Sequence, residues 1–150
     1  MGKEHPRRLG RKVVLEALYA YEISGEDRAK VLNDAIHRKS YDDKTKLFIV
    51  ELFDAAMDNK EWCETEIKTR LNNWEFDRVA ILDRLLLVEA MSEIYFIEDV
   101  PPKVSISEAI EIAKQYSTEE SPGFVNGVLD NVYKSMAKKA KEKIHDTKFD

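Results

Sequence analysis

Arginines gather at the start of the chain, in a pattern that suits contacts to a nucleic acid. Arg7, Arg8 and Arg11 lie close together, between Lys3 and Lys12. A guanidinium can donate two hydrogen bonds at once to a phosphate or a base edge, and it can stack on an exposed base. The cluster is compatible with RNA binding. Taken alone, a solvated basic end of the chain is the simpler interpretation.

Two aromatic residues are further candidates for a binding surface. Tyr19 lies off the apolar stripe of its expected helix, so its ring is available to a partner. Phe124 follows Gly123 at the start of another expected helix, where unpaired backbone N–H groups favour an anion. A ring that caps the hydrophobic core would explain Phe124 equally well.

The histidines do not form a metal site. His5, His37 and His145 fall in one terminal segment, a short expected helix and the other terminal segment. A metal site in a helical bundle needs carboxylates and Glu-x-x-His motifs on facing helices, whereas Asp34 and His37 form a single such spacing with no second copy. We therefore expect no metal.

No residue set has the spacing of a catalytic centre. Glu89 and Glu93 are four residues apart, which is more typical of a polar helix stripe than of an acid–base pair. Cys63 has no activating motif around it and is expected to be a small buried hydrophobe. The sequence also has no glycine-rich phosphate loop and no nucleophile elbow. We predict that the protein is not an enzyme and needs no cofactor.

The elements that position these residues are predicted to be helices. The chain has only 5 glycines and 4 prolines, and its apolar residues recur at helical spacing with no strand pattern of useful length. Residues 77–97 are apolar on nearly all sides, which is typical of a central helix. Expected helices cover about residues 9–24, 31–38, 42–59, a short segment at 62–71, and then 77–97, 105–116 and 121 onward.

Local signals predict where several of these helices begin, end and pack. Ser105 and Glu108 have the spacing of a capping box, and Ser121 before Pro122 is typical of a helix start. Ser24 and Gly25 should end the first helix. The expected helix at 42–59 buries these residues: Leu47, Ile49, Val50, Phe53 and Met57.

Charge is distributed unevenly along the chain. The 150 residues carry a net charge of −5 and are enough for one well-packed domain. Residues 1–12 carry +4 and the segment from Lys134 onward carries +3, which leaves −12 for residues 13–133. Local positive charge can hold nucleic acid on an acidic protein, because phosphate contacts act over about 10 Å.

The sequence indicates a soluble protein of the cytoplasm. Its single cysteine, Cys63, excludes an internal disulfide. The first twelve residues contain no apolar stretch, and the longest apolar region, residues 79–97, is interrupted by charged residues. We expect no secretion signal and no membrane contact.

Two segments match the motifs of a known family. One reads VPPKVSISEAIEIAK and then FVNGVLD, at residues 100–114 and 124–130. The other has arginines at 7, 8 and 11, followed by Ala-Leu-Tyr at 17–19. In this order they resemble the NusB family of bacterial transcription antitermination factors, and the resemblance covers about residues 7–137.

The resemblance implies a fold and a set of partners. The fold is all-α, with two small helical subdomains packed into one helical bundle domain without enzymatic activity. Residues 1–150 would form a single RNA-binding domain, with a basic segment at 1–12 and a lysine-rich tail that is disordered from about residue 140. Family members pair with a small-subunit ribosomal protein called NusE. The pair binds single-stranded boxA RNA in nascent ribosomal transcripts, within the antitermination complex of RNA polymerase, and a homodimer is a further possibility.

The resemblance also assigns roles to individual residues. Partner-facing positions correspond to Tyr19 and Asp83, where a glutamate is familiar in the family. RNA-binding positions correspond to Arg7, Arg8, Arg11, Glu120 and Phe124, with Lys3 and Lys12 in the same basic segment.

The chain departs from the family pattern at three places. Leu9 and Gly10 stand where basic residues and alanine are common, which bears on the first helical turn and on RNA affinity. Val88 and Glu89 replace a familiar arginine-containing pair on the central helix, and Ser107 replaces an asparagine.

Two other classes of protein remain to be weighed. A helical protein–protein adaptor with merely solvated basic ends would fit the net charge of −5. A related module occurs in ribosomal RNA methyltransferases, but 150 residues leave no room for their cofactor-binding domain.

Overall fold

The protein is built from helices, as the sequence predicts. The structure is a computed structural model that describes residues 5–71, 76–116 and 118–148, with side chains up to Met136. Within these residues there is no strand. The elements are α1 (Pro6–Ser24), α2 (Arg28–His37), α3 (Asp43–Lys68), a short 3₁₀ turn (Phe76–Arg78), α4 (Ile81–Phe96), α5 (Pro102–Tyr116) and α6 (Ser121–Lys148).

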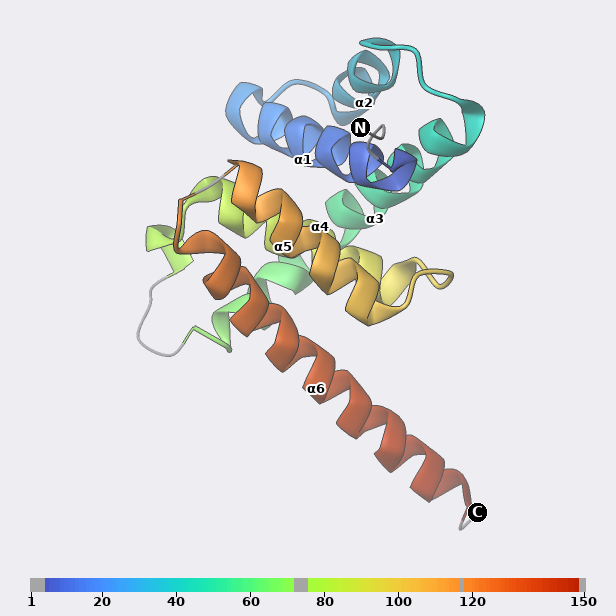
Figure 1. The fold of residues 1–150 in the computed structure, drawn as a ribbon, viewed down its shortest axis with the longest axis vertical. Coiled ribbons are helices and arrows are strands. Elements are labelled where there is room, and N and C mark those ends of the chain that lie inside the picture. The colour runs from blue at the N-terminus through green and yellow to red at the C-terminus, as the bar shows by residue number, and fades with distance from the viewer. Residues whose placement is uncertain (1–4, 72–75, 117, 149–150) are drawn as a thin grey trace.

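The helices form two groups joined by α3 (Figure 1). α1 and α2 lie together at one end, and α4, α5 and α6 pack together at the other, while α3 contacts both α1 and α4. α1 and α5 run parallel, since Arg8 pairs with Glu108 and Glu16 with Tyr116. This arrangement gives the two small helical subdomains that the sequence predicts.

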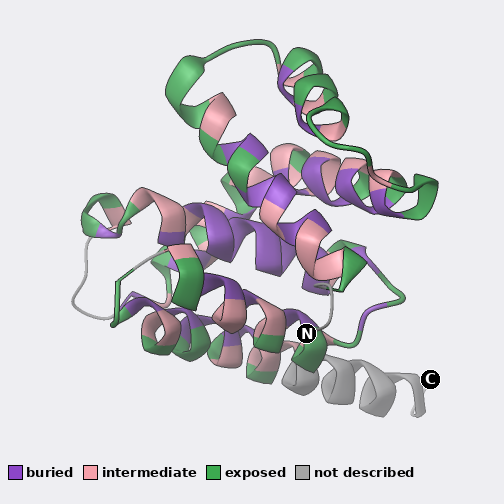
Figure 2. Ribbon diagram, turned by 45° about the horizontal axis from the view of Figure 1, so that its top comes forward, coloured by how far each residue is buried: buried purple, intermediate pink, exposed green. Residues whose placement is uncertain are grey.

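α4 is the central helix. Between Asp83 and Ile94 every residue except Arg84 is buried. Buried residues accordingly gather in the middle of the molecule (Figure 2). The apolar character of this segment on nearly all sides correctly predicts its position.

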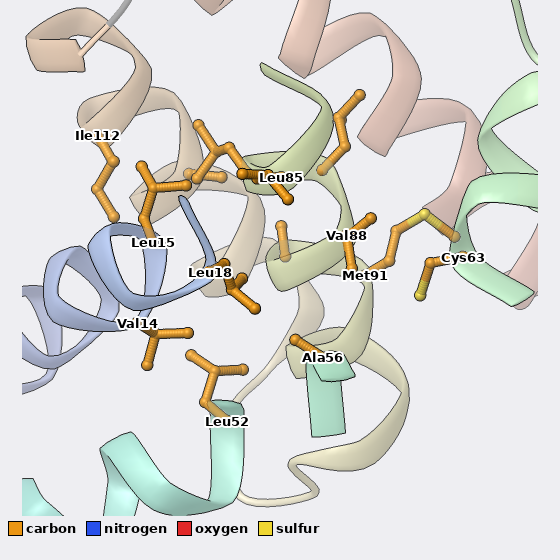
Figure 3. Close-up of a cluster of buried hydrophobic side chains, with 14 of the residues drawn as sticks. Val14, Leu15, Leu18, Leu52, Ala56, Cys63, Leu85, Val88, Met91 and Ile112 are labelled. Atoms are coloured by element: carbon orange, nitrogen blue, oxygen red, sulfur yellow. The ribbon is translucent and has the colours of Figure 1, made fainter. Parts of the chain in front are cut away.

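One hydrophobic core joins all six α-helices, and Figure 3 shows part of it. Cys63 is fully buried in this core, as predicted, and burial raises the pKa of its thiol to about 11. The other labelled core residues are Val14, Leu15 and Leu18 from α1, Ala56 and Leu52 from α3, Leu85, Val88 and Met91 from α4, and Ile112 from α5.

α1 begins earlier than the apolar pattern predicts. Pro6 occupies its first turn, where a missing N–H costs nothing, and His5 Nδ1 accepts a hydrogen bond from the backbone N–H of Arg7. The predicted end is confirmed by Gly25, whose φ of +67° is left-handed and whose N–H donates to Tyr21 O. The early start places Arg7 and Arg8 on the helix instead of before it.

Gly10 allows close packing between α1 and α3. A Cβ built at this position would lie 3.0 Å from Cδ2 of Phe48. Two guanidinium groups also lie against the Phe48 ring, with Arg7 Cζ at 4.8 Å and Arg11 Cζ at 5.3 Å from its centroid. The departure from alanine at Gly10 therefore has a packing reason.

The predicted break between residues 59 and 62 is wrong. α3 is one continuous helix, and its first turn is capped by Asp42, whose carboxylate accepts from the Thr45 N–H at 2.7 Å. Leu47 was predicted to be buried but is 59% exposed, because the buried stripe runs through Phe48 and Leu52 and leaves Leu47 on the neighbouring face.

The predicted capping box of α5 is also wrong. α5 begins at Pro102, three residues before Ser105. Ser105 lies within α5, its side chain is buried, and its Oγ donates a hydrogen bond to Glu93 Oε2. Glu108 pairs with Arg8 on α1. Both side chains therefore bond to residues of other helices and do not cap α5. The predicted start of α6 at Ser121 is confirmed.

The backbone of α6 continues as helix to Lys148. The side chains beyond Met136, which include most lysines of the tail, lie outside the described residues. Over the part of the chain that is described, no helix combines the length and the apolar character that a membrane span requires.

Candidate nucleic-acid interface

Ion pairs connect each of the three arginines of α1 to later parts of the chain. Arg7 Nη2 donates to Asp99 Oδ2 at 2.7 Å, in the turn between α4 and α5. Arg8 forms a two-bonded pair with Glu108 on α5, with N···O distances of 2.7 and 3.0 Å. These two arginines are therefore held in fixed positions at the surface.

Arg11 lies in the interior. Its side chain is 5% exposed, and it forms a two-bonded pair with Glu93 of α4 at 2.7 and 2.9 Å. Glu93 accepts a further hydrogen bond from Ser105 Oγ, so its carboxylate has partners on both α1 and α5. Sequence reasoning gave Arg11 an RNA contact, whereas its burial and pairing fit the role of joining three helices.

Arg7 and Arg8 keep about a third of their side chains exposed. The pKa of the Glu108 carboxyl lies below its ordinary value, mainly because Arg8 donates to it, and Arg7 lowers the pKa of Asp99 in the same way. Lys12 follows Arg8 by one turn and is half-buried. Lys3 lies outside the described residues.

Glu89 lies beside this network without joining it. Its side chain is buried, and its Oε1 has no hydrogen-bond partner among the described residues. Burial, with a smaller contribution from the neighbouring Glu93, raises its pKa well above the ordinary value. The prediction that Glu89 and Glu93 form a polar surface stripe is wrong, since both face the core.

A second group of predicted residues meets at the start of α6. Phe124, Glu120 and Asp83 line one pocket of about 240 Å³, together with Arg78. Phe124 is half-buried and Glu120 is exposed. An aromatic ring beside a carboxylate and a guanidinium can stack on a base and bond its edge.

Asp83 has a structural contact that sequence reasoning did not foresee. It is 7% exposed, and its Oδ2 accepts a hydrogen bond from Ser121 Oγ at 3.0 Å. It therefore attaches the start of α6 to α4, and little of its surface remains for a partner. Tyr19, the other predicted partner residue, is 39% exposed.

The two groups lie at opposite ends of the α1–α5 pair (Figure 1). Arg7 pairs with Asp99 before α5 and Arg8 pairs with Glu108 in the middle of α5, whereas Phe124 follows the turn after the end of α5. The helix rises by about 12 Å between Glu108 and Tyr116, its last residue. A ligand that contacts both groups must extend along the second half of α5.

Sequence reasoning missed the carboxylates that hold the arginines. The sequence-based interpretation places Glu93 on a polar stripe and Glu108 in a capping box. Carboxylates inside the mostly apolar segment 81–97 are a signal for an ion pair, because a buried charge needs a partner. The signal does not say which arginine supplies it.

The described residues thus define an all-helical protein in which a basic helix start is tied by carboxylates to two other helices. The NusB family model matches residues 8–134, and the chain belongs to the NusB family.

Relatives and solved structures agree with this membership. The chain is 42% identical over 134 residues to the transcription antitermination protein NusB of Chloroherpeton thalassium, covering 89% of this chain and 64% of that relative. It is 38% identical over 135 residues to the protein of the same name from Methylacidiphilum infernorum, covering 89% and 94%.

The structure of T. maritima NusB is 36% identical, with a TM-score of 0.80 over 88% of this chain and 93% of that one. A structure of antitermination factors NusB and NusE in complex with dsRNA contains a chain with 24% identity and a TM-score of 0.79, covering 87% and 97%, which supports the fold alone.

Proposed function

We propose that the protein is a transcription antitermination factor that pairs with the ribosomal protein NusE and binds boxA RNA in nascent ribosomal transcripts. Its NusB family membership supports this, as do the names of its relatives. A structural neighbour was solved with NusE and dsRNA, which shows what that protein can bind. The protein acts by assembly within the antitermination complex of RNA polymerase in the cytoplasm, without catalysis.

The observation that carries the RNA-binding proposal is the fixed, exposed pair Arg7 and Arg8. Asp99 and Glu108 hold both guanidinium groups at the surface, so little conformational freedom is lost when a phosphate binds. A guanidinium has five N–H donors, and Arg7 uses one of them in its bond to Asp99. About a third of each arginine side chain is exposed, so a phosphate can approach both guanidinium groups.

The proposal divides the predicted residues by position. Arg7, Arg8 and Lys12 contact phosphates at one end of α5, together with Lys3. Phe124 stacks on a base at the other end, and Glu120 accepts from its amino group. Arg11 and Asp83 position these groups from the interior, and Tyr19 contacts NusE.

A double variant tests the RNA contact. Arg7→Ala with Arg8→Ala should lose most affinity for a single-stranded boxA RNA while still binding NusE. Fluorescence anisotropy over a range of salt concentrations measures the RNA affinity, whose log–log slope against salt should fall by about 0.7 per lost phosphate contact. Arg28→Ala is the matched control, because Arg28 is also a surface arginine paired with carboxylates, Asp54 and Asp58.

Tyr19→Asp tests the other side of the division. It should weaken NusE in a pull-down and leave RNA affinity of the isolated protein unchanged. Equal damage to both activities by both variants, with the fold intact by circular dichroism, would contradict the division of surfaces.

A protein–protein adaptor without direct RNA binding is the alternative. It is favoured by one observation, that Arg7, Arg8 and Arg11 are all paired within the chain. Nuclease treatment distinguishes the two functions. If the protein is an adaptor, it still binds NusE and the other proteins of the complex after RNA is removed. In that case the wild-type protein also shows no salt-dependent affinity for RNA.

A further inference from the structure

A second pocket lies between α1 and α2, and Lys12 is the one residue of its lining to which the proposed function gives an RNA contact. It has a volume of about 240 Å³ and is bounded by α1, α2, the loop after α2 and the end of α5. This volume equals that of about eight water molecules in the liquid, which leaves room for a flat ring system. Its apolar wall is made of small residues, including Ala17 and Ala35.

Three cations surround this pocket. Lys12 comes from α1, one turn after Arg8, and Arg38 and Lys39 come from the end of α2 and the loop that follows it. Arg38 and Lys39 are exposed. Since Lys12 continues the helix surface that begins with Arg8, a strand held by Arg8 reaches this pocket without leaving α1.

The polar groups that line the pocket suit a nucleotide better than they suit an acidic peptide. Glu16 lines it and accepts a hydrogen bond from Tyr116 Oη at 2.9 Å, with Arg38 Nη1 3.9 Å from its other oxygen. Tyr41 and Tyr116 add aromatic surface. An acidic peptide offers negative charge and backbone N–H donors but no flat ring for the apolar wall, whereas an unpaired nucleotide offers a charged phosphate, a flat ring and donor groups on one molecule.

We propose that this pocket binds one unpaired nucleotide of the RNA, with its base against Tyr41 and Tyr116 and an amino group of the base donating to Glu16. The phosphates on either side lie among Lys12, Arg38 and Lys39. This inference rests on the proposed RNA-binding function and adds a contact site on α2, outside the basic N-terminal segment.

Lysine variants test the phosphate part of the site. Lys39→Ala should weaken binding of a single-stranded boxA RNA and lower the salt slope by about 0.7, as expected for one phosphate contact. Lys30→Ala, on the neighbouring helix α2, is the matched control, since Lys30 is exposed and pairs only with Glu26 and Asp34 in the described bonds. It should leave the slope unchanged.

Crosslinking and base substitution test the base part. RNA that carries photoreactive thiobases, introduced at one position at a time, should crosslink to peptides that contain Tyr41 or Tyr116. Glu16→Gln keeps the shape of the side chain and should reduce the preference for a base with an amino group at that position.

The outcomes separate this inference from the function on which it rests. If wild-type protein binds RNA and the Arg7, Arg8 variant does not, but Lys39→Ala matches Lys30→Ala and no crosslink falls on either tyrosine, the pocket is not a nucleotide site and the proposed function stands. If wild-type protein binds no RNA, both are overturned.

Discussion

At the scale of single residues, the same residue type has different roles along one helix. Arg7, Arg8 and Arg11 are all paired with carboxylates, but only Arg11 is buried with its partner. Removing one member of a buried pair leaves the other charge without water or partner, which costs about 3–5 kcal/mol, whereas an exposed pair contributes about 0–1 kcal/mol. Burial, rather than pairing, separates the structural arginine from the candidate RNA contacts.

Arg11→Ala should therefore lower the free energy of unfolding by about 3–5 kcal/mol, because Glu93 would remain buried and charged. Arg7→Ala, the control, should change it by less than about 1 kcal/mol. Urea denaturation followed by circular dichroism measures both. Equal stability of the two variants would mean that the Arg11–Glu93 pair is not desolvated in solution.

Glu89 gives the fold a pH dependence of its own. Its pKa is raised by burial and by Glu93, while Arg11 lowers it in part. A folded-state pKa above the unfolded value means that the folded protein binds the proton more tightly. The stabilising contribution is complete below the ordinary glutamate pKa, and it is lost as pH rises through the raised value.

Glu89→Gln should remove this loss, because the amide stays neutral. The variant and wild type should have similar free energies of unfolding near pH 4, and the variant should become the more stable as pH rises above about 5. Asp99 and Glu108 have lowered pKa values, so they make the fold more stable at higher pH in both proteins. Subtracting the free energy of unfolding of wild type from that of the variant at each pH cancels this shared contribution. A difference that does not change with pH would contradict the raised pKa.

At the scale of elements, the sequence predicts helix positions and helix ends that depend on one helix alone. It does not predict features that depend on contacts between two helices. The central position of α4, the end of α1 at Gly25 and the start of α6 at Ser121 follow from local composition and backbone chemistry. The Ser105 and Glu108 cap failed because both side chains bond to other helices. No local pattern reports such partners.

The candidate site shows the same limit. Residue type and family motifs indicate Arg7, Arg8, Lys12 and Phe124, and the structure gives these four residues half-buried positions. The interior positions of Arg11 and Asp83 depend on Glu93 and Ser121, which are far away in the sequence. The pocket beside Glu16 is lined by residues of α1, α2, the loop after α2 and the end of α5, so no single segment of the sequence indicates it.

Two glycines in helices should respond to alanine in opposite directions. Gly127 has no heavy atom within 4 Å of an added Cβ, so Gly127→Ala should raise the free energy of unfolding by about 0.4–1 kcal/mol through a less disordered unfolded chain. Gly10→Ala should lower it, because the Cβ would press on the buried Phe48 ring. Thermal denaturation of both variants tests this, and stabilisation by Gly10→Ala would mean that the ring can move aside.

At the scale of the whole molecule, the parallel pairing of α1 and α5 decides how a ligand can be held. The pairs Arg8–Glu108 and Glu16–Tyr116 fix the two helices side by side, with the arginines at the beginning of α1 and Phe124 beyond the end of α5. Single-stranded RNA is extended enough to reach both ends, while a compact ligand is not. The arrangement therefore favours an RNA whose contacts are spread along α5.

Separated contacts should contribute independently to RNA affinity. Arg8→Ala and Phe124→Ala should each weaken binding of a long single-stranded RNA, the second by about 1–3 kcal/mol for one stacked base, and their effects should add in the double variant. As the RNA is shortened from one end, sensitivity to one substitution should disappear while sensitivity to the other remains. Anisotropy titrations with a series of RNA lengths measure this. Strong coupling between the two substitutions, or loss of both sensitivities at the same length, would contradict two separate contacts along the RNA.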